Sequence, residues 1–151
     1  MVFRGQRLGP ICIQGYIMRQ LTLFEESYLL EALPIKHWDS KTGVVEHLPL
    51  RYSIDRRGKI YDKKLLKYRK TLATKAGYKN ITIRFENGKK KSYLHHRLIA
   101  CTFLENNNKL KYTQVDHIDE NKYNNHILNL RWVTPSENMM KKQCTKQLEM
   151  F

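Results

Sequence analysis

Apolar and polar residues alternate along the middle of the chain in a way that predicts antiparallel hairpins. Over residues 81–86 every second position is apolar, which is the period of a strand with one buried face. Asn87-Gly88 follows and favours a tight turn, so residues 89–94 can return as the partner strand. Residues 52–61 offer two further short strands around an Asp-Arg-Arg-Gly sequence, whose glycine can supply the positive φ of a turn. The stretch from 51 to 94 is therefore predicted to be β structure.

Helical patterns flank this stretch on both sides. Residues 95–104 place their apolar positions on one face of a helix. A sharper helix start lies at Thr134, which can cap the helix while Glu137 completes a capping box. Nearer the N-terminus, residues 22–33 begin with the same capping-box spacing and predict one short helix that Pro34 ends.

Residues 112–142 combine two strands and a helix. Residues 114–118 can be extended, the polar run 119–125 is typical of a loop, and residues 128–133 can extend again before the helix. This ββα order brings the end of the first strand opposite the first turns of the helix. The sequence as a whole therefore predicts an α+β fold, with basic antiparallel β-strands followed by a compact ββα motif.

Four parts follow from these patterns. Residues 1–50 are the least informative and are predicted to hold a short helix and loops of unknown role. Residues 51–94 form the basic β region, residues 95–143 hold the ββα motif, and residues 144–151 form a C-terminal tail.

Charge is concentrated in one part of the chain. The formal net charge is +14, and residues 51–97 hold 16 basic and 3 acidic side chains, whereas residues 1–50 are neutral. A positive field this concentrated favours binding of a polyanion, with nucleic acid as the first candidate, although a solvated basic surface is the alternative. Tyrosines are interleaved with the cations, as suits a surface that contacts the DNA backbone. The candidate contacts are Arg56, Arg57, Lys59, Lys63, Lys64, Lys67, Arg84, Lys89, Lys91 and Arg97.

Cysteine usage and hydropathy narrow the class of protein further. The three cysteines are odd in number and far apart, which argues against a disulfide framework and against a zinc site built on a Cys-x-x-Cys pair. A reducing, cytoplasmic location fits this usage. The chain has no run that approaches the roughly 18 apolar residues of a membrane helix, and its start lacks the pattern of a secretory signal. We therefore expect a protein without a membrane association.

Asp116, His117 and Asn138 are the strongest candidates for chemistry. Hydrolysis of a phosphodiester requires a base near neutral pH, and a neutral histidine is suited to take the proton of the attacking water. The phosphate and the leaving oxygen gain negative charge, which a metal ion can stabilise. A carboxylate and an amide oxygen suit a hard cation such as Mg²⁺ or Mn²⁺. These three residues therefore form a chemically coherent set for phosphodiester hydrolysis.

Each of these residues also has a structural interpretation. The Asp-His pair can be a hydrogen-bonded structural pair, Asn129 can cap or close a turn, and Asn138 can be an ordinary surface residue of a helix. A different metal site, made by Asp119 and His126 together with His117, is a further alternative.

The ordered set of motifs over about residues 93–142 resembles the HNH endonucleases of phages and group I introns. Residues 52–61 weakly resemble the β-strand DNA-binding repeat that often precedes this motif. The segments that carry the main resemblance are His95–Ala100, Val115–Asp119, Asn124-Asn125, Asn129–Thr134 and Glu137-Asn138.

The resemblance implies a role for each matched position of a ββα-metal motif. Asp116 and Asn138 would be the two metal ligands, with one divalent cation, Mg²⁺ or Mn²⁺, at the scissile phosphate. His117 would be the general base, and Asn129 would occupy the central position that orients this base. The implied activity is metal-dependent nicking or cleavage of double-stranded DNA.

Two other functions remain alternatives to a nuclease. The first is a repurposed, non-catalytic nucleic-acid-binding or scaffold protein derived from such a nuclease, in a phage or ribonucleoprotein assembly. The second is a zinc-stabilised binding module, which the missing cysteine pairs disfavour. Residues 1–50, which the resemblance does not explain, are a candidate surface for a protein partner or for self-association.

Overall fold

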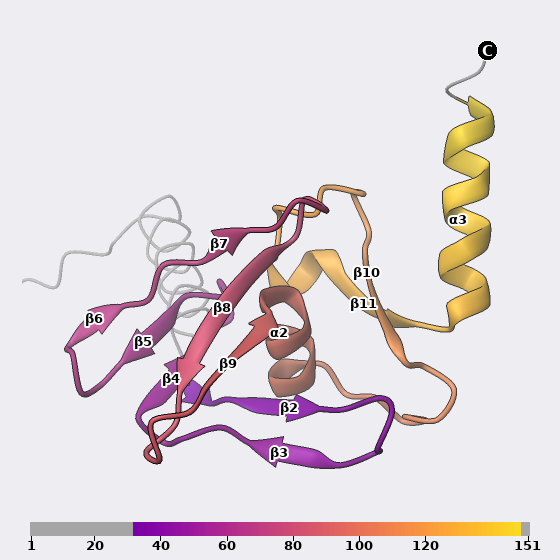
Figure 1. Ribbon diagram of the computed structural model, residues 1–151. Coiled ribbons are helices and arrows are strands. Elements are labelled where there is room, and N and C mark those ends of the chain that lie inside the picture. The colour runs from indigo at the N-terminus through magenta and orange to yellow at the C-terminus, as the bar shows by residue number, and fades with distance from the viewer. Residues whose placement is uncertain (1–31, 149–151) are drawn as a thin grey trace, which may run out of the picture. The chain divides into compact units, whose positions relative to one another are not determined.

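The computed structural model describes residues 32–148 of the chain, which form an α+β fold of antiparallel strands around a central helix (Figure 1). These residues belong to one compact unit, which begins at Ala32. The elements are β1 (Leu33–Pro34), β2 (Lys36–Trp38), β3 (Val45–His47), β4 (Tyr52–Ile54), β5 (Ile60–Asp62), β6 (Lys67–Tyr68), β7 (Leu72–Ala73), β8 (Lys79–Arg84), β9 (Lys90–Leu94), α2 (His95–Phe103), β10 (Gln114–His117), a 3₁₀ turn η1 (Ile127–Asn129), β11 (Leu130–Val133) and α3 (Pro135–Leu148).

The predicted β region consists of two small antiparallel sheets. One sheet has the strand order β1-β4-β5-β6, and the other has the order β7-β8-β9. The β8–β9 hairpin turns at Gly88, whose φ of 79° lies in the left-handed region that favours glycine. The alternation that predicted β8 is confirmed, because Ile81 and Ile83 are buried and their neighbour Arg84 is exposed.

Two buried carboxylates shape the first of these sheets. Asp62 is 0% exposed, and it binds the Arg51 guanidinium at 2.6 and 2.7 Å while it also accepts from two backbone N–H groups in the turn that follows. Asp55 accepts from the Lys59 backbone N–H at 2.8 Å and so closes the β4–β5 turn. These two acidic residues of the basic region therefore build its turns, and most of its cations are exposed.

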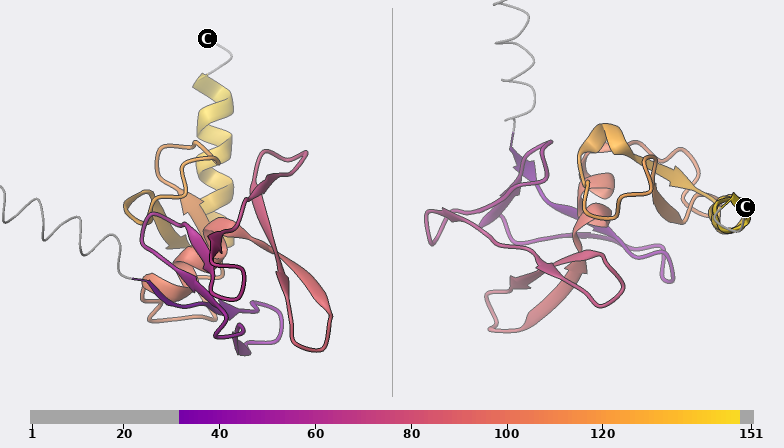
Figure 2. Two further views of the ribbon diagram at one scale, coloured as in Figure 1. Left: turned by 90° about the vertical axis from the view of Figure 1, so that its left-hand side faces the viewer. Right: turned by 90° about the horizontal axis from the view of Figure 1, so that it is seen from above.

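Helix α2 connects this region to the ββα motif. It contacts β2, β8, β9, β10 and β11, and Figures 1 and 2 show it between the β4–β6 strands and the β10–β11 hairpin. Leu98 and Ile99 are fully buried. A single apolar cluster therefore runs through both parts of the fold; its members are Ile35, Leu48, Tyr52, Ile54, Ile60, Ile81, Ile83, Tyr93, Leu98, Ile99, Ile127 and Leu130.

The structure differs from the sequence prediction between residues 33 and 47. Loops were expected there, but this stretch forms β1, β2 and β3. Strands of two or three residues are too short to leave a periodic pattern, which is why the sequence did not reveal them. The predicted helix over 22–33 lies outside the described residues, except for its last positions, and Leu33 belongs to β1.

The ββα order is confirmed, with one shift. β11 begins at Leu130 because residues 127–129 first form η1, which His126 caps by accepting the Leu128 N–H. Within residues 32–148, neither helix has the length and apolar composition that crossing a membrane would require.

Candidate active site

The β10–β11 hairpin presents Asp116 and His117 next to the start of α3. Their cross-strand partners are Arg131 and Leu130, and the exposed fractions of the two residues are only 8% and 5%. Helix α3 begins with the predicted capping box: Glu137 accepts from the Thr134 N–H at 2.8 Å, and the Thr134 hydroxyl accepts from the Glu137 N–H at 3.1 Å. This cap fixes the first turns of the helix, where the candidate metal ligand Asn138 lies.

The His117 ring belongs to a buried chain of hydrogen bonds. Its Nε2 lies 2.7 Å from the Asn125 side-chain oxygen, and the Asn125 amide nitrogen lies 3.1 Å from His95 Nδ1. The other ring nitrogen of His95 bonds the Gly58 carbonyl. Burial lowers the pKa of His95, although the Gly58 contact opposes this shift. The chain joins β10, the loop after it, the start of α2 and the β4–β5 turn.

Two further rings pack against His117. The centroid of the His96 ring lies 5.0 Å from that of His117 in an edge-to-face arrangement, and the Tyr78 ring lies 5.2 Å from His96 and 6.2 Å from His117. Burial, and secondly the nearby His117, lowers the pKa of His96 to about 3. His96 is therefore neutral near pH 7, and the β7–β8 turn reaches the candidate site through Tyr78.

Asn129 holds the loop rather than the His117 ring. Its side chain donates to the Asp119 carboxylate at 2.7 Å and to the Asn124 carbonyl at 2.8 Å, and its oxygen accepts from the Asp119 N–H at 3.0 Å. The sequence suggested that Asn129 would orient the base. In the structure, the hydrogen-bond partner of the His117 ring is instead the Asn125 side-chain oxygen. Any effect of Asn129 on His117 is therefore indirect, through the loop that carries Asn125.

The Asp116 carboxylate already has two cationic partners. Arg131 binds its Oδ2 at 2.9 and 3.0 Å. The Lys141 ammonium lies 3.1 and 3.2 Å from the two carboxylate oxygens, 2.7 Å from the His117 carbonyl and 3.3 Å from the Ile118 carbonyl. A positive charge thus lies among four oxygen atoms at this position.

The residue types around Asp116 fit a hard divalent cation. The Asn138 amide nitrogen donates to the Gln114 side-chain oxygen at 2.6 Å, which leaves the Asn138 oxygen as the atom available to a metal. Lys141 shows that the oxygens of Asp116 and of the adjacent backbone accept a cation at this position. Carboxylate, amide and carbonyl oxygens are the ligands that Mg²⁺ and Mn²⁺ prefer.

The alternative site made by Asp119, His126 and His117 is not formed. Asp119 bonds three asparagines of its own loop, and His126 caps η1. Over the described part of the chain, no three His, Cys, Asp or Glu side chains are grouped so that they could hold a metal ion.

The cations predicted to contact DNA divide into two sets. Arg56 and Arg97 are half-buried: the Arg56 guanidinium lies 5.1 Å from the Phe103 ring centroid, and Arg97 donates to the Thr113 and Trp38 carbonyls. The Arg97 guanidinium thus has hydrogen-bond partners within the fold, and its contact with DNA stays a prediction. The other set is exposed, although Lys91 also pairs with Glu46 at 3.0 Å; it comprises Arg57, Lys59, Lys63, Lys64, Lys67, Arg84, Lys89 and Lys91.

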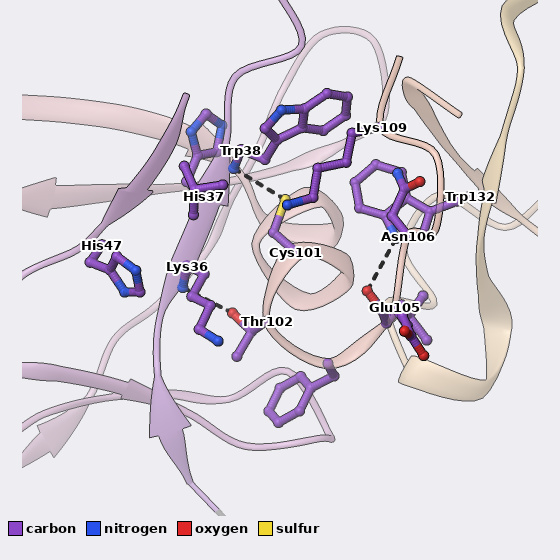
Figure 3. A pocket seen from close by; sticks show the side chains of 13 residues that line it. Lys36, His37, Trp38, His47, Cys101, Thr102, Glu105, Asn106, Lys109 and Trp132 are labelled. Atoms are coloured by element: carbon purple, nitrogen blue, oxygen red, sulfur yellow. Dashed lines mark hydrogen bonds between the residues drawn. The ribbon is translucent and has the colours of Figure 1, made fainter. Parts of the chain in front are cut away.

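A pocket of about 380 Å³ lies between β2 and the end of α2 and shares no residue with the His117 site (Figure 3). Trp38 and Trp132 line it, and their rings flank the Arg97 guanidinium at 5.5 and 5.8 Å. The Trp38 backbone N–H donates to the Cys101 sulfur at 3.4 Å. Both tryptophan rings therefore pack against Arg97.

Sequence reasoning missed three contributors to the site. Asn125 and His95 lie inside the motifs that carried the resemblance, but nothing in their spacing showed that they bond one another across 30 residues. Lys141 lies one turn after Asn138 on α3, and this helical spacing is a signal that could have placed it near Asp116.

A ββα unit with a buried Asp-His pair on its first strand and an asparagine in its helix is the arrangement expected of a ββα-metal motif. Comparison with known proteins agrees, because residues 93–140 match the family model described as HNH endonuclease. The DNA endonuclease I-HmuI of Bacillus phage SP01 is 40% identical over 105 residues, which are 68% of this chain and 55% of that protein. An uncharacterised HNH endonuclease of Acanthamoeba polyphaga mimivirus is 38% identical over 102 residues, 68% of this chain and 30% of the relative.

A solved structure titled "DNA binding and cleavage by the HNH homing endonuclease I-HmuI" is also similar to this chain. The TM-score is 0.58 at 36% identity, over 64% of this chain and 54% of that one. This chain belongs to the HNH endonuclease family. It spans between about a third and about half of the length of the curated relatives described above.

Proposed function

We propose that this protein is a metal-dependent endonuclease that hydrolyses phosphodiester bonds in double-stranded DNA. The proposal is carried by the buried Asp116-His117 pair at the end of β10, where the His117 ring bonds Asn125 through Nε2. Asn138 of α3 bonds Gln114 of the same strand, which supports its proposed place beside this pair. A purely binding module has no need of a buried imidazole that is held at one nitrogen only.

In the proposed reaction, His117 takes the proton of the water that attacks phosphorus. Asp116 and Asn138 would hold the cation, Mg²⁺ or Mn²⁺, which supplies charge stabilisation for the phosphate and for the leaving 3′ oxygen. The His95–Asn125 chain keeps the imidazole from rotating. The exposed cations of the β region hold the duplex by its phosphates. Tyr78, between β7 and β8, packs near the His96 and His117 rings and so connects this region to the site.

A repurposed nucleic-acid-binding protein is the second candidate function. One observation favours it: the Asp116 carboxylate is already neutralised by Lys141 and Arg131, as in a purely structural ion-pair cluster. The two functions differ in turnover, not in DNA binding.

Cleavage of supercoiled plasmid in the presence of Mg²⁺ or Mn²⁺ tests the proposal. The wild-type protein should nick or linearise the plasmid, and EDTA should abolish the reaction. His117→Ala should retain DNA affinity and lose turnover by at least about 100-fold. His47→Ala, on exposed strand β3, is the matched control and should cut like wild type. If the wild-type protein binds the plasmid but does not cut it with any metal tested, the protein is a nucleic-acid-binding protein instead.

A further inference from the structure

Three hydrogen bonds connect His117 to Asn125, His95 and Gly58, and all three have the same donor-to-acceptor direction. The last partner, Gly58, lies outside the HNH motif. We propose that Asn125 and His95 are positioning residues that hold His117 with its Nε2 protonated, so that Nδ1 is the atom that takes the proton from water. This inference rests on the proposed nuclease function and assigns the atoms that make His117 a base.

The direction is fixed at the far end of the chain, at the Gly58 carbonyl. A carbonyl oxygen only accepts, so the His95 Nε2 must donate to it. A neutral His95 then has its Nδ1 as an acceptor, which receives the Asn125 amide N–H at 3.1 Å. The Asn125 oxygen consequently faces His117 and accepts from its Nε2 at 2.7 Å. No other tautomer of His117 satisfies all three links.

Burial makes any other arrangement of these donors and acceptors costly. Asn125 is 6% exposed, His95 is 6% exposed and His117 is 5% exposed, so water cannot readily replace a lost partner. Reversing one link would set two donors or two acceptors against each other in a buried site, which costs the full desolvation of both groups. Burial also lowers the pKa of His95, which favours the neutral ring.

The last atom of this hydrogen-bond chain is His117 Nδ1, which takes part in no hydrogen bond with residues 32–148. It is also absent from the buried polar atoms that lack a partner, whereas Nδ1 of the neighbouring His96 is one of them. The nitrogen left over by the chain is thus the one accessible to a water molecule. The β4–β5 turn, which belongs to the basic region, thereby determines which atom of His117 is basic.

Three variants isolate this role in the full-length protein. His95→Phe keeps a ring but removes both hydrogen bonds, whereas His95→Gln retains one donor and one acceptor. Asn125→Leu keeps the side-chain shape and removes the link to His117. The measurements are the ¹⁵N NMR signature of the His117 tautomer at alkaline pH without DNA, the turnover number on plasmid, and the DNA dissociation constant.

We expect wild-type His117 to carry its proton on Nε2. Asn125→Leu and His95→Phe should lose this preference and reduce turnover by about 100-fold, with the DNA dissociation constant unchanged. His95→Gln should stay within about tenfold of wild type, a rescue that a merely space-filling role would not give.

The outcomes separate this inference from the proposed function. A wild-type protein that cuts DNA while His117 is protonated on Nδ1 overturns the inference and leaves the nuclease standing. The inference also fails if Asn125→Leu folds, keeps the Nε2 tautomer and cuts at the wild-type rate. If the wild-type protein never cuts DNA, the proposed nuclease function is wrong, and so is the catalytic role of the hydrogen-bond chain. The wild-type spectrum decides the tautomer even where a variant does not fold.

Discussion

The basic β region and the HNH motif both depend on polar side chains, but they hold them in opposite environments. Lys63, Lys64 and Lys67 of the β region are exposed, whereas Asp116 and His117 of the motif are less than a tenth exposed. Exposed charges act over several ångströms, are screened by salt and are individually replaceable. Buried polar groups act through single hydrogen bonds, and each lost partner leaves a desolvated atom.

This contrast predicts two kinds of response to mutation. In the β region, each cation should contribute a small and roughly additive share of DNA affinity. In the motif, one substitution should disturb several partners at once. The boundary between the two is not clean, because Gly58 lies in the β region by sequence and bonds the chain that ends at His117.

The largest expected effect comes from Gly58→Ala, which crosses that boundary. A Cβ at this position would lie 2.6 Å from the Ile99 side chain and 3.2 Å from the His95 ring, and the φ of 78° disfavours any residue except glycine. Overpacking in a buried site and a left-handed backbone together should reduce the free energy of unfolding by about 3 kcal/mol. Denaturant unfolding measures this loss.

Gly43→Ala is the matched control for Gly58→Ala. Its φ is 70°, and an added Cβ meets no atom within 4 Å, so only the backbone cost of about 1 kcal/mol remains. Equal losses of unfolding free energy for the two variants would show that the close approach of Gly58 to His95 and Ile99 does not affect stability. The β region and the HNH motif would then be independent at the β4–β5 turn.

Much of the fold could be predicted from the sequence wherever a pattern was long or a local signal strong. The alternation over β8, the turn at Gly88 and the capping box at Thr134 each act within a few residues, so the sequence displays them directly. β1 to β3 were missed because strands of two or three residues leave no periodic pattern. In addition, β1 pairs with the distant β4, so its two residues are a strand only in the folded protein.

The candidate site could be predicted as a set of residues but not as a set of contacts. Asp116, His117 and Asn138 were chosen because their chemistry suits phosphodiester hydrolysis, and these assignments stay predictions. The partner of the His117 ring could not be deduced, since Asn125 and Asn129 are the same residue type in the same loop. Only the geometry shows that one bonds the ring and the other bonds the loop.

A smaller effect is expected at Lys141, which lies within the motif itself. Its ammonium shares the Asp116 oxygens that a metal would use, so the two cations compete for one carboxylate. Lys141→Met should therefore bind Mn²⁺ about tenfold more tightly in the absence of DNA, as expected for removal of one nearby like charge. Titration followed by electron paramagnetic resonance measures this affinity without any turnover.

Lys142→Met removes the same charge from the same helix, but Lys142 is exposed. It should leave Mn²⁺ affinity nearly unchanged because solvent screens its charge. If both variants bind Mn²⁺ like wild type, Lys141 does not compete with the metal, and its ammonium instead supports the Asp116 carboxylate from a position that the metal never occupies.

The smallest effect is expected at Lys64, in the β region, where the comparison predicts replaceable charges. Its side chain is exposed, and only its backbone N–H bonds Asp62, so Lys64→Gln should leave the fold intact. DNA affinity should fall only a few-fold, and the slope of log K against log salt should decrease in magnitude by about 1, the loss of one phosphate contact. Lys109→Gln, an exposed lysine outside the basic region, is the charge-matched control and should leave the slope unchanged. If the two variants change the slope equally, net charge alone governs binding, and the β region has no privileged contact with the duplex.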